Sequence, residues 1–158
     1  AKKEGLEQIA AIFEETALNE REHAKRFFKF LEGEMVEITA SYPAGVIGDT
    51  MENLKAAAAG EHEEWTELYP MFADVAEEEG FKAVAVCFRM IAEAEKAHEN
   101  RYNKLWSNLD EGKVFERDGK IIWKCRNCGY LHEGVKAPKT CPACLHPQSY
   151  FEIKEQNY

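Results

Sequence analysis

Residues 88–102 read FRMIAEAEKAHENRY, and two positions on their apolar stripe carry ionisable side chains. Apolar and aromatic residues recur here at intervals of three or four, which is the spacing of the buried face of a helix. Glu95 and His98 fall on that same face, between Ile91 and Tyr102. An ionised carboxylate in a packed interior is strongly unfavourable unless it is paired or coordinated. We therefore predict that the carboxylate of Glu95, on the buried face of this helix, is paired with a cation or coordinated to a metal ion.

The two helices predicted before this one repeat the feature. Glu20 interrupts the apolar stripe of the first helix, with His23 one turn further along, and Glu61 and Glu64 interrupt the stripe of the second. Basic residues are scarce on these faces, so the acids would repel one another without a bound polyvalent cation. Oxygen-rich ligation with one or two imidazoles suits iron or manganese. The three helices are therefore predicted to share one metal centre.

The spacing Glu-x-x-His occurs twice, at residues 20–23 and 95–98. This spacing places two ligands at positions i and i+3 of one helix, where both can coordinate the same metal ion. A single copy is a weak signal in a chain with 29 acidic residues, because such residues are mostly solvated. Two copies on apolar stripes, joined by the two acids of the second helix, favour the metal site. Tyr69 and Tyr102 lie one or two turns from proposed ligands and are expected to hydrogen-bond a carboxylate.

The overall pattern predicts two domains. Three long helices are expected at about residues 6–32, 50–79 and 81–109, with a long crossover between the first two, and together they indicate a bundle. After Gly112 the chain changes to short β-like runs separated by turns. We therefore expect a helical domain over residues 1–110 and a small β domain over residues 111–158.

Four of the five cysteines form two tight pairs in the second domain. They are Cys125-Arg126-Asn127-Cys128 and Cys141-Pro142-Ala143-Cys144. Two such knuckles can enclose one tetrahedral metal ion, and their spacing suits zinc and iron equally. The alternative interpretation of these knuckles is a structural zinc ribbon. The sequences Cys128-Gly129-Tyr130 and Cys141-Pro142 resemble rubredoxins, which favours iron.

The charge balance argues against several partners. Twenty Lys and Arg residues stand against 29 Asp and Glu, giving a net charge of −9, which repels nucleic acids and anionic membranes. The sequence has no apolar run of the roughly 20 residues needed to cross a bilayer. It also shows no secretion signal, and its paired cysteines fit metal ligation in a reducing compartment. We therefore expect a cytoplasmic protein that binds neither nucleic acid nor membrane.

Taken together, the two domains resemble the rubrerythrin family over nearly the whole chain. The segments that carry the likeness are Asn19-Glu20-Arg21-Glu22-His23-Ala24-Lys25-Arg26, Ala59-Gly60-Glu61-His62-Glu63-Glu64, Ala94-Glu95-Lys96-Ala97-His98-Glu99 and the two cysteine knuckles. The resemblance implies a mainly α, ferritin-like fold of the four-helix-bundle type, followed by a rubredoxin-like β domain. It also implies two irons at the carboxylate and histidine site and one iron at the cysteine site, with zinc as a possible substitute in either.

The resemblance further implies a peroxidase that reduces hydrogen peroxide to water for protection against oxidative stress, with electrons from NAD(P)H through a reductase or a rubredoxin. The resemblance implies that Glu20 and Glu95 bridge the irons and that Glu61 and His98 are terminal ligands. It also implies that Glu64 and His23 bind one of the irons in turn, as its oxidation state changes. Tyr69 matches a tyrosine of the family that contacts the ligands.

One expectation sets this chain apart from the family pattern. Rubrerythrins carry a further helix before the segment that begins here, which adds a glutamate ligand. We therefore expect a fourth helix in the functional particle, contributed by a separate piece of chain or exchanged between the subunits of a homodimer or larger homo-oligomer. Two other functions stay open from the sequence. One is a ferroxidase or iron-binding ferritin relative, and the other is a structural zinc protein with an acidic bundle.

Overall fold

The structure is a computed structural model that describes residues 1–156, so Asn157 and Tyr158 at the end of the expected β domain lie outside the described residues. The helices are α1 (Glu7–Phe28), α2 (Thr50–Glu63), α3 (Tyr69–Glu78) and α4 (Lys82–Asp110), with a π-helical turn at Glu64–Leu68. The strands are β1 (Glu116–Cys125), β2 (Leu131–Lys136) and β3 (Phe151–Ile153). The mainly α fold with a small C-terminal sheet is confirmed.

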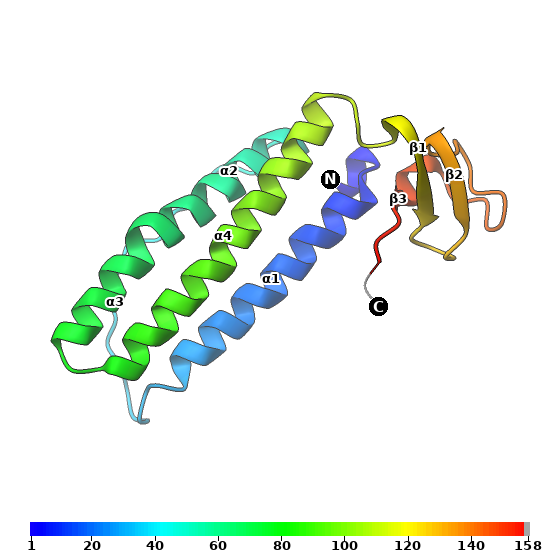
Figure 1. Ribbon diagram of the computed structural model, residues 1–158. Helices are drawn as coiled ribbons and strands as arrows, with labels where there is room; N and C mark the ends of the chain where they lie inside the picture. The colour runs from blue at the N-terminus through cyan, green and yellow to red at the C-terminus, as the bar shows by residue number, and fades with distance from the viewer. Residues whose placement is uncertain (157–158) are drawn as a thin grey trace. The chain divides into compact units, whose positions relative to one another are not determined.

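Three helical rods lie side by side in the structure (Figure 1): α1, α4 and the α2–α3 rod. The apolar stripes of the rods supply their contacts, as in Ala73, Ala76 and Ala85, which are buried with Val84 and Phe88 packed against them. Small side chains let α3 and α4 approach closely, while the larger ones fill the space that remains. The residues that interrupt the stripes therefore face the interior of the bundle.

Two helix boundaries differ from the expected ones. The first helix ends at Phe28 rather than near residue 32, and Gly33 and Glu34 then adopt positive φ angles of 104° and 67°, which no helix can include. The helix expected at about residues 50–79 is interrupted by a π-helical turn directly before Pro70, because proline has no N–H with which to continue the regular hydrogen-bond ladder.

The C-terminal sheet is antiparallel with the strand order β2-β1-β3. Trp123, Cys125, Ala137, Cys141 and Phe151 form its buried core. Two of these five residues are cysteines of the two knuckles. The core of this small domain and its proposed metal site are therefore built from the same residues.

By its contacts the chain separates into a unit of residues 16–104 and a unit of residues 1–15 together with the chain from Leu105 onward. Both α1 and α4 contribute to each unit. The domain boundary expected after residue 110 stays a prediction. None of the helices in the described part of the chain is long and apolar enough to span a membrane.

Candidate metal centres

The three helical rods bring four predicted ligands to one point. Glu20 comes from α1, Glu61 from the last turn of α2, and Glu95 and His98 from the middle of α4. One ligand atom of each lies within 4.8 Å of one ligand atom of every other. Glu95 is fully buried, and Glu61 and His98 are each only 7% exposed. A set of carboxylates this close and this buried requires a cation among them.

The contacts within this group are close but poorly formed as hydrogen bonds. His98 Nδ1 lies 3.0 Å from Glu95 Oε2, 3.2 Å from Glu20 Oε1 and 3.5 Å from Glu61 Oε2. None of these four buried atoms has a hydrogen-bond partner with acceptable geometry. Buried polar atoms are normally satisfied, so atoms that converge without bonding one another are arranged as ligands around a common centre. The donor set therefore fits a hard or borderline metal such as iron.

His23 and Glu64 lie at the edge of this group. His23 Nδ1 is 2.9 Å from Glu95 Oε1 and 3.0 Å from Glu20 Oε2. Glu64 opens the π-helical turn. Burial, together with the charges of Glu95, Glu61 and Glu20, raises the pKa of Glu64 to about 7. Four of the six predicted ligands thus form the cluster, His23 contacts two of them, and Glu64 lies near enough for their charges to act on it. The roles of all six as ligands stay predictions.

The electrostatics of the group show how strongly its charges interact. Contacts with Glu20, and then with Glu61 and Glu95, raise the pKa of His98 to about 11. Burial raises the pKa of Glu61, whereas burial of Glu20 is outweighed by contacts with His98 and His23 that lower its pKa. Such perturbation by specific partners inside a protein marks a functional site more often than a solvated surface.

The two predicted tyrosines behave differently. Burial, followed by the charge of Glu64, raises the pKa of Tyr69, so its phenol keeps its proton beside the acids. Tyr102 is 3% exposed, and its hydroxyl forms a hydrogen bond with Thr16. Tyr69 is therefore close enough to feel the charges of the carboxylates, while its ring packs against Phe27 and Phe88. The hydrogen bond of Tyr102 holds α1 against α4.

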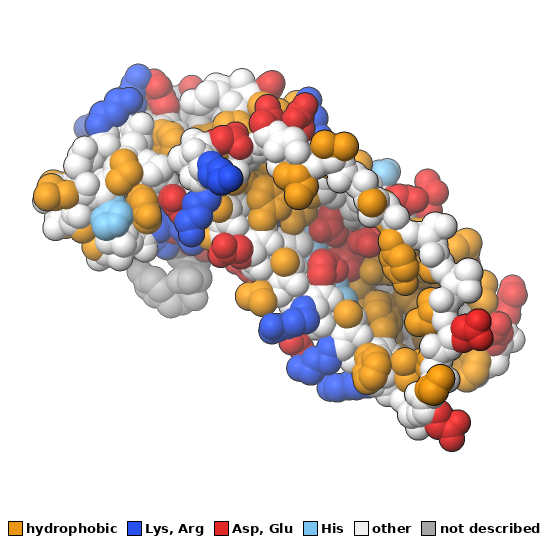
Figure 2. Space-filling model, turned by 180° about the vertical axis from the view of Figure 1, so that it is seen from behind, with side chains coloured by type: hydrophobic (Ala, Val, Ile, Leu, Met, Phe, Trp, Pro, Cys, Tyr) orange, Lys and Arg blue, Asp and Glu red, His pale blue; other side chains and the backbone are white. Residues whose placement is uncertain are grey.

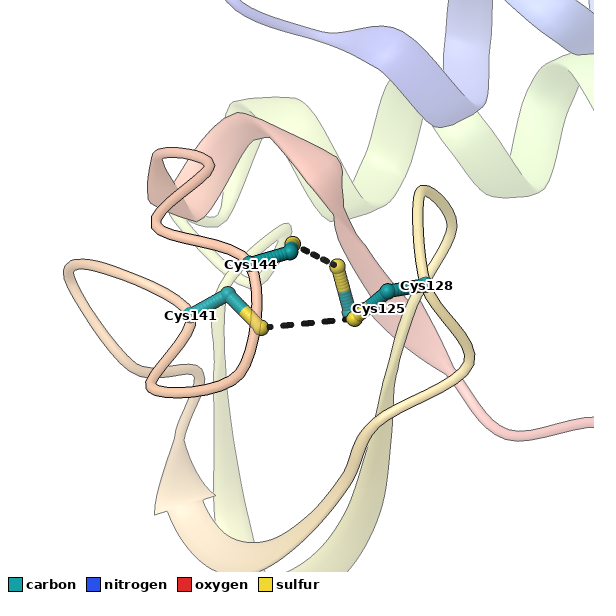
Figure 3. Close-up of side chains that lie close together, drawn as sticks. All are labelled: Cys125, Cys128, Cys141 and Cys144. Atoms are coloured by element: carbon teal, nitrogen blue, oxygen red, sulfur yellow. Dashed lines mark hydrogen bonds between the residues drawn. The ribbon is translucent and has the colours of Figure 1, made fainter.

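The four knuckle cysteines meet at a second point (Figure 3). The Sγ atoms of Cys125 and Cys144 are 3.7 Å apart, and those of Cys128 and Cys141 are 3.6 Å apart. A tetrahedral metal with metal–sulfur bonds of about 2.3 Å requires sulfur atoms roughly 3.8 Å apart, whereas a disulfide requires about 2.05 Å. The knuckles therefore fit a tetrahedral metal ion and form no disulfide.

Backbone amides point at these sulfur atoms. The N–H of Tyr130 donates to the sulfur of Cys128, and the N–H of His146 donates to that of Cys144 and thereby lowers the pKa of Cys144 to about 6. Gly129, in the first knuckle, has a φ of 79°, which glycine adopts without strain. Hydrogen bonds of this kind tune the charge that the thiolates give to the metal.

Two groups of polar side chains beside the sites were not predicted from the sequence. Trp65 donates a hydrogen bond from Nε1 to Glu99 Oε2 at 2.5 Å, and His62 Nδ1 lies 3.2 Å from the same carboxylate. Near the cysteines, Glu152 is 2% exposed and pairs with two basic side chains. The only signal in the sequence was a charged residue inside the short run Ser149–Ile153, which indicates nothing without its partners.

Comparisons with known proteins agree with both sites. The family model described as Rubrerythrin matches residues 1–106, and the model described as Rubrerythrin, rubredoxin-like domain matches residues 123–152. A rubrerythrin of Porphyromonas gingivalis is 65% identical over all of this chain, which spans 79% of that protein. A rubrerythrin of Nitratidesulfovibrio vulgaris is 56% identical over all of this chain, which spans 83% of that protein. A solved structure of nigerythrin in a mixed-valence state superposes with a TM-score of 0.58 at 29% identity, covering 98% of this chain and 74% of that one.

Proposed function

Because the chain belongs to the rubrerythrin family, we propose that it reduces hydrogen peroxide to water with electrons that originate from NAD(P)H. The chain is an oxidoreductase of a family that binds iron, here at the carboxylate and histidine site and at the four-cysteine site. The observation that carries the proposal is that one chain holds a thiolate site suited to single electrons together with a buried, acid-rich site suited to a metal pair. Peroxide takes up two electrons, and a metal pair can store two electrons that a single-electron donor delivers one at a time.

We assign the ligands of the helical site as follows. Glu20 and Glu95 would each hold both irons, and Glu61 and His98 would each hold one of them. Glu64 and His23 would alternate in holding one iron. The alternation is supported by their positions at the edge of the group and by the π-helical turn at Glu64, since such turns interrupt the regular ladder and often occur at functional sites.

When bound, the metal pair supplies electrons and a place where both oxygens of peroxide are polarised. The residues of the chain do the rest. Buried side chains around Glu95 limit the access of water, and Tyr69 keeps its proton and can donate a hydrogen bond from Oη toward the site. The overall change takes up two electrons and two protons and turns one peroxide into two waters.

The proposal includes partners. We place a reductase or a rubredoxin as the donor to the cysteine site, and electron transfer between subunits of a homodimer or larger homo-oligomer. The cytoplasm, where NAD(P)H is available, is the location that fits this electron supply. Zinc in either site would leave the protein inactive, because zinc has no redox chemistry.

An apolar groove beside the helical site is relevant to the question whether the three rods form the whole helical bundle. It has a volume of about 630 Å³ and lies between α1 and α3 over α4, lined by Phe27, Leu31, Phe72, Val75 and Phe88 among others. On the face shown in Figure 2, acidic side chains gather in a hollow beside hydrophobic ones. The Glu20 side chain is 39% exposed, more than that of any other predicted bridging or terminal ligand. We propose that a fourth amphipathic helix fills this groove in the functional particle.

The fourth helix is tested by mass and size. The active particle should contain helical polypeptide beyond the 158 residues of one chain, or should be an oligomer whose subunits exchange helices. Intact mass spectrometry and light scattering of peroxide-reducing fractions measure this. Full activity from a strict monomer with the mass of this sequence alone would overturn it.

The peroxidase proposal is tested with Glu95→Ala and its control Glu93→Ala. Glu95 is fully buried among the ligands, whereas Glu93 is exposed on the same helix. Glu95→Ala should lose iron from the helical site and abolish NAD(P)H-dependent peroxide reduction, and Glu93→Ala should retain both. Unchanged iron content and turnover in Glu95→Ala would refute the assignment. Uptake of iron far above three ions per chain, without peroxide turnover, would favour the ferroxidase or storage alternative.

A further inference from the structure

Glu152 is a buried acid in the cysteine-rich domain. It lies in β3, is 2% exposed, and has Phe151 and Ile153, which pack in the domain core, as its neighbours. Its Oε1 lies 2.7 Å from Lys124 Nζ, and its Oε2 contacts the guanidinium of Arg126. One buried anion thus holds two cations, whose side chains are about one third exposed.

The two cations flank a ligand of the iron. Lys124 and Arg126 are the residues on either side of Cys125, and Lys124 pairs directly with Glu152 across β1 and β3. Lys124 and Cys125 are successive residues of β1, so their side chains point to opposite faces of the strand, and Arg126 directly follows the strand. In the same knuckle, the N–H groups of Asn127 and Cys128, which follow Arg126, donate to the sulfur of Cys125.

Charges at this place act on the redox equilibrium of the iron. Adding an electron makes the thiolate-bound iron one unit more negative, so a nearby cation favours the reduced form and a nearby anion favours the oxidised form. The buried charge of Glu152 is screened less than a charge in water, so it acts on the iron more strongly than an exposed acid at the same distance. Glu152, Lys124 and Arg126 together carry a net charge of plus one, whereas the two cations without Glu152 would carry plus two.

We propose that Glu152 is a positioning residue that sets the reduction potential of the cysteine-bound iron by holding Lys124 and Arg126 beside Cys125 and offsetting one of their charges. The inference rests on iron in the cysteine site and does not depend on peroxide as the substrate.

The test is the midpoint potential of the full-length, iron-loaded protein, followed through its iron–thiolate absorbance. Glu152→Gln keeps an acceptor for Arg126 but removes the charge, so it should favour reduction by about tenfold, or about 59 mV for a one-electron couple. Arg126→Gln removes a cation and should shift the potential in the opposite direction. Lys124→Gln should shift it in the same direction as Arg126→Gln, and it leaves Glu152 paired with Arg126 should the other variants fail to hold iron.

Glu116→Gln is the matched control. Glu116 lies in β1, the strand that also contains Lys124, and pairs with Lys136 at 2.8 Å, but both side chains are well exposed. Glu116→Gln removes one negative charge, as Glu152→Gln does, and should change the redox equilibrium of the cysteine-bound iron less than twofold. Shifts of the same sign in Glu152→Gln and Lys124→Gln, or a Glu152→Gln shift no larger than that of the control, would show a purely structural role. Because the potential is read without peroxide, a failure of the peroxidase proposal would be seen separately.

Discussion

At the scale of single residues, the helical site stores charge repulsion that iron relieves. Glu61, Glu64 and Glu95 lie in or beside one buried group, and burial, followed by the charges of neighbouring acids, raises the pKa values of Glu61 and Glu64. His98 and His23 offset part of this repulsion. The same carboxylates therefore stabilise the iron-loaded protein and destabilise the iron-free one.

Glu64→Gln should consequently have opposite effects in the two states. At pH 7 the iron-free variant should be more stable to unfolding by about 1 kcal/mol, because a half-buried charge disappears and solvent screens part of its repulsion. The loaded variant should hold iron less tightly. Urea unfolding of both forms measures the first effect, and competition with a chelator measures the second. Exposed Glu67→Gln, three residues away, serves as the control and should change neither.

At the scale of elements, α2 owes its start to a capping box. Asp49 Oδ1 accepts a hydrogen bond from the N–H of Glu52 at 2.8 Å, and Glu52 Oε2 accepts one from the N–H of Asp49 at 3.0 Å. Both bonds satisfy amides that a helix start leaves unpaired. The cap lies three turns before Glu61, so it stabilises the helix and does not touch the metal.

Asp49→Ala should therefore lower the free energy of unfolding by about 1 kcal/mol. Iron content and the potential of the cysteine site should stay as in the parent protein. Thermal unfolding followed by circular dichroism checks the first expectation, and metal analysis checks the second. Asp49→Asn, which still accepts the hydrogen bond, should recover most of the loss; if it does not, the cap explanation is wrong.

The π-helical turn has a local cause and a consequence for the site. The N–H of Tyr69 donates to the carbonyl of Glu64, five residues back, and Pro70 has no N–H to offer. The wider turn separates the ligand Glu61, in regular α-helix, from Glu64, at the start of the irregular stretch. One helical rod thus carries Glu61 in regular helix and Glu64 in an irregular turn.

At the scale of the molecule, the two metal sites differ in what they do for the fold. The helices have an apolar core apart from the metal, as at Ala73 and Ala85. The sheet has only three strands, and its small core includes Cys125 and Cys141 themselves. Domains this small are usually stabilised by a metal or disulfides.

Cys141→Ser should therefore abolish the iron–thiolate absorbance and unfold the sheet, while the helical circular dichroism and the iron of the helical site are retained. Cys87→Ala provides the control, because Cys87 is buried in α4 outside both proposed metal groups. It should keep the colour. Near-ultraviolet circular dichroism of Trp123, in the core of the sheet, reports the unfolding. Retention of its signal without metal would show that the strands are stable alone.

Much of this molecule follows from local sequence. The spacing of apolar residues predicted three helices because each stripe depends on a 3.6-residue period, and Glu20, Glu61 and Glu95 were found because they interrupt such stripes. The pairing of the cysteines needed only their spacing. The end of α1 at Phe28 was missed, because apolar residues continue past it to Leu31.

Only the tertiary structure decided what lies between elements. It brought ligand atoms from three rods within 4.8 Å, left an apolar groove between α1 and α3, and paired Glu152 with the two cations beside Cys125. A periodic pattern says which face of a helix or strand is buried, but not which residue of another element it meets. That partner depends on packing between segments far apart in the chain, and here it determines which acids hold metal and which one holds Lys124 and Arg126.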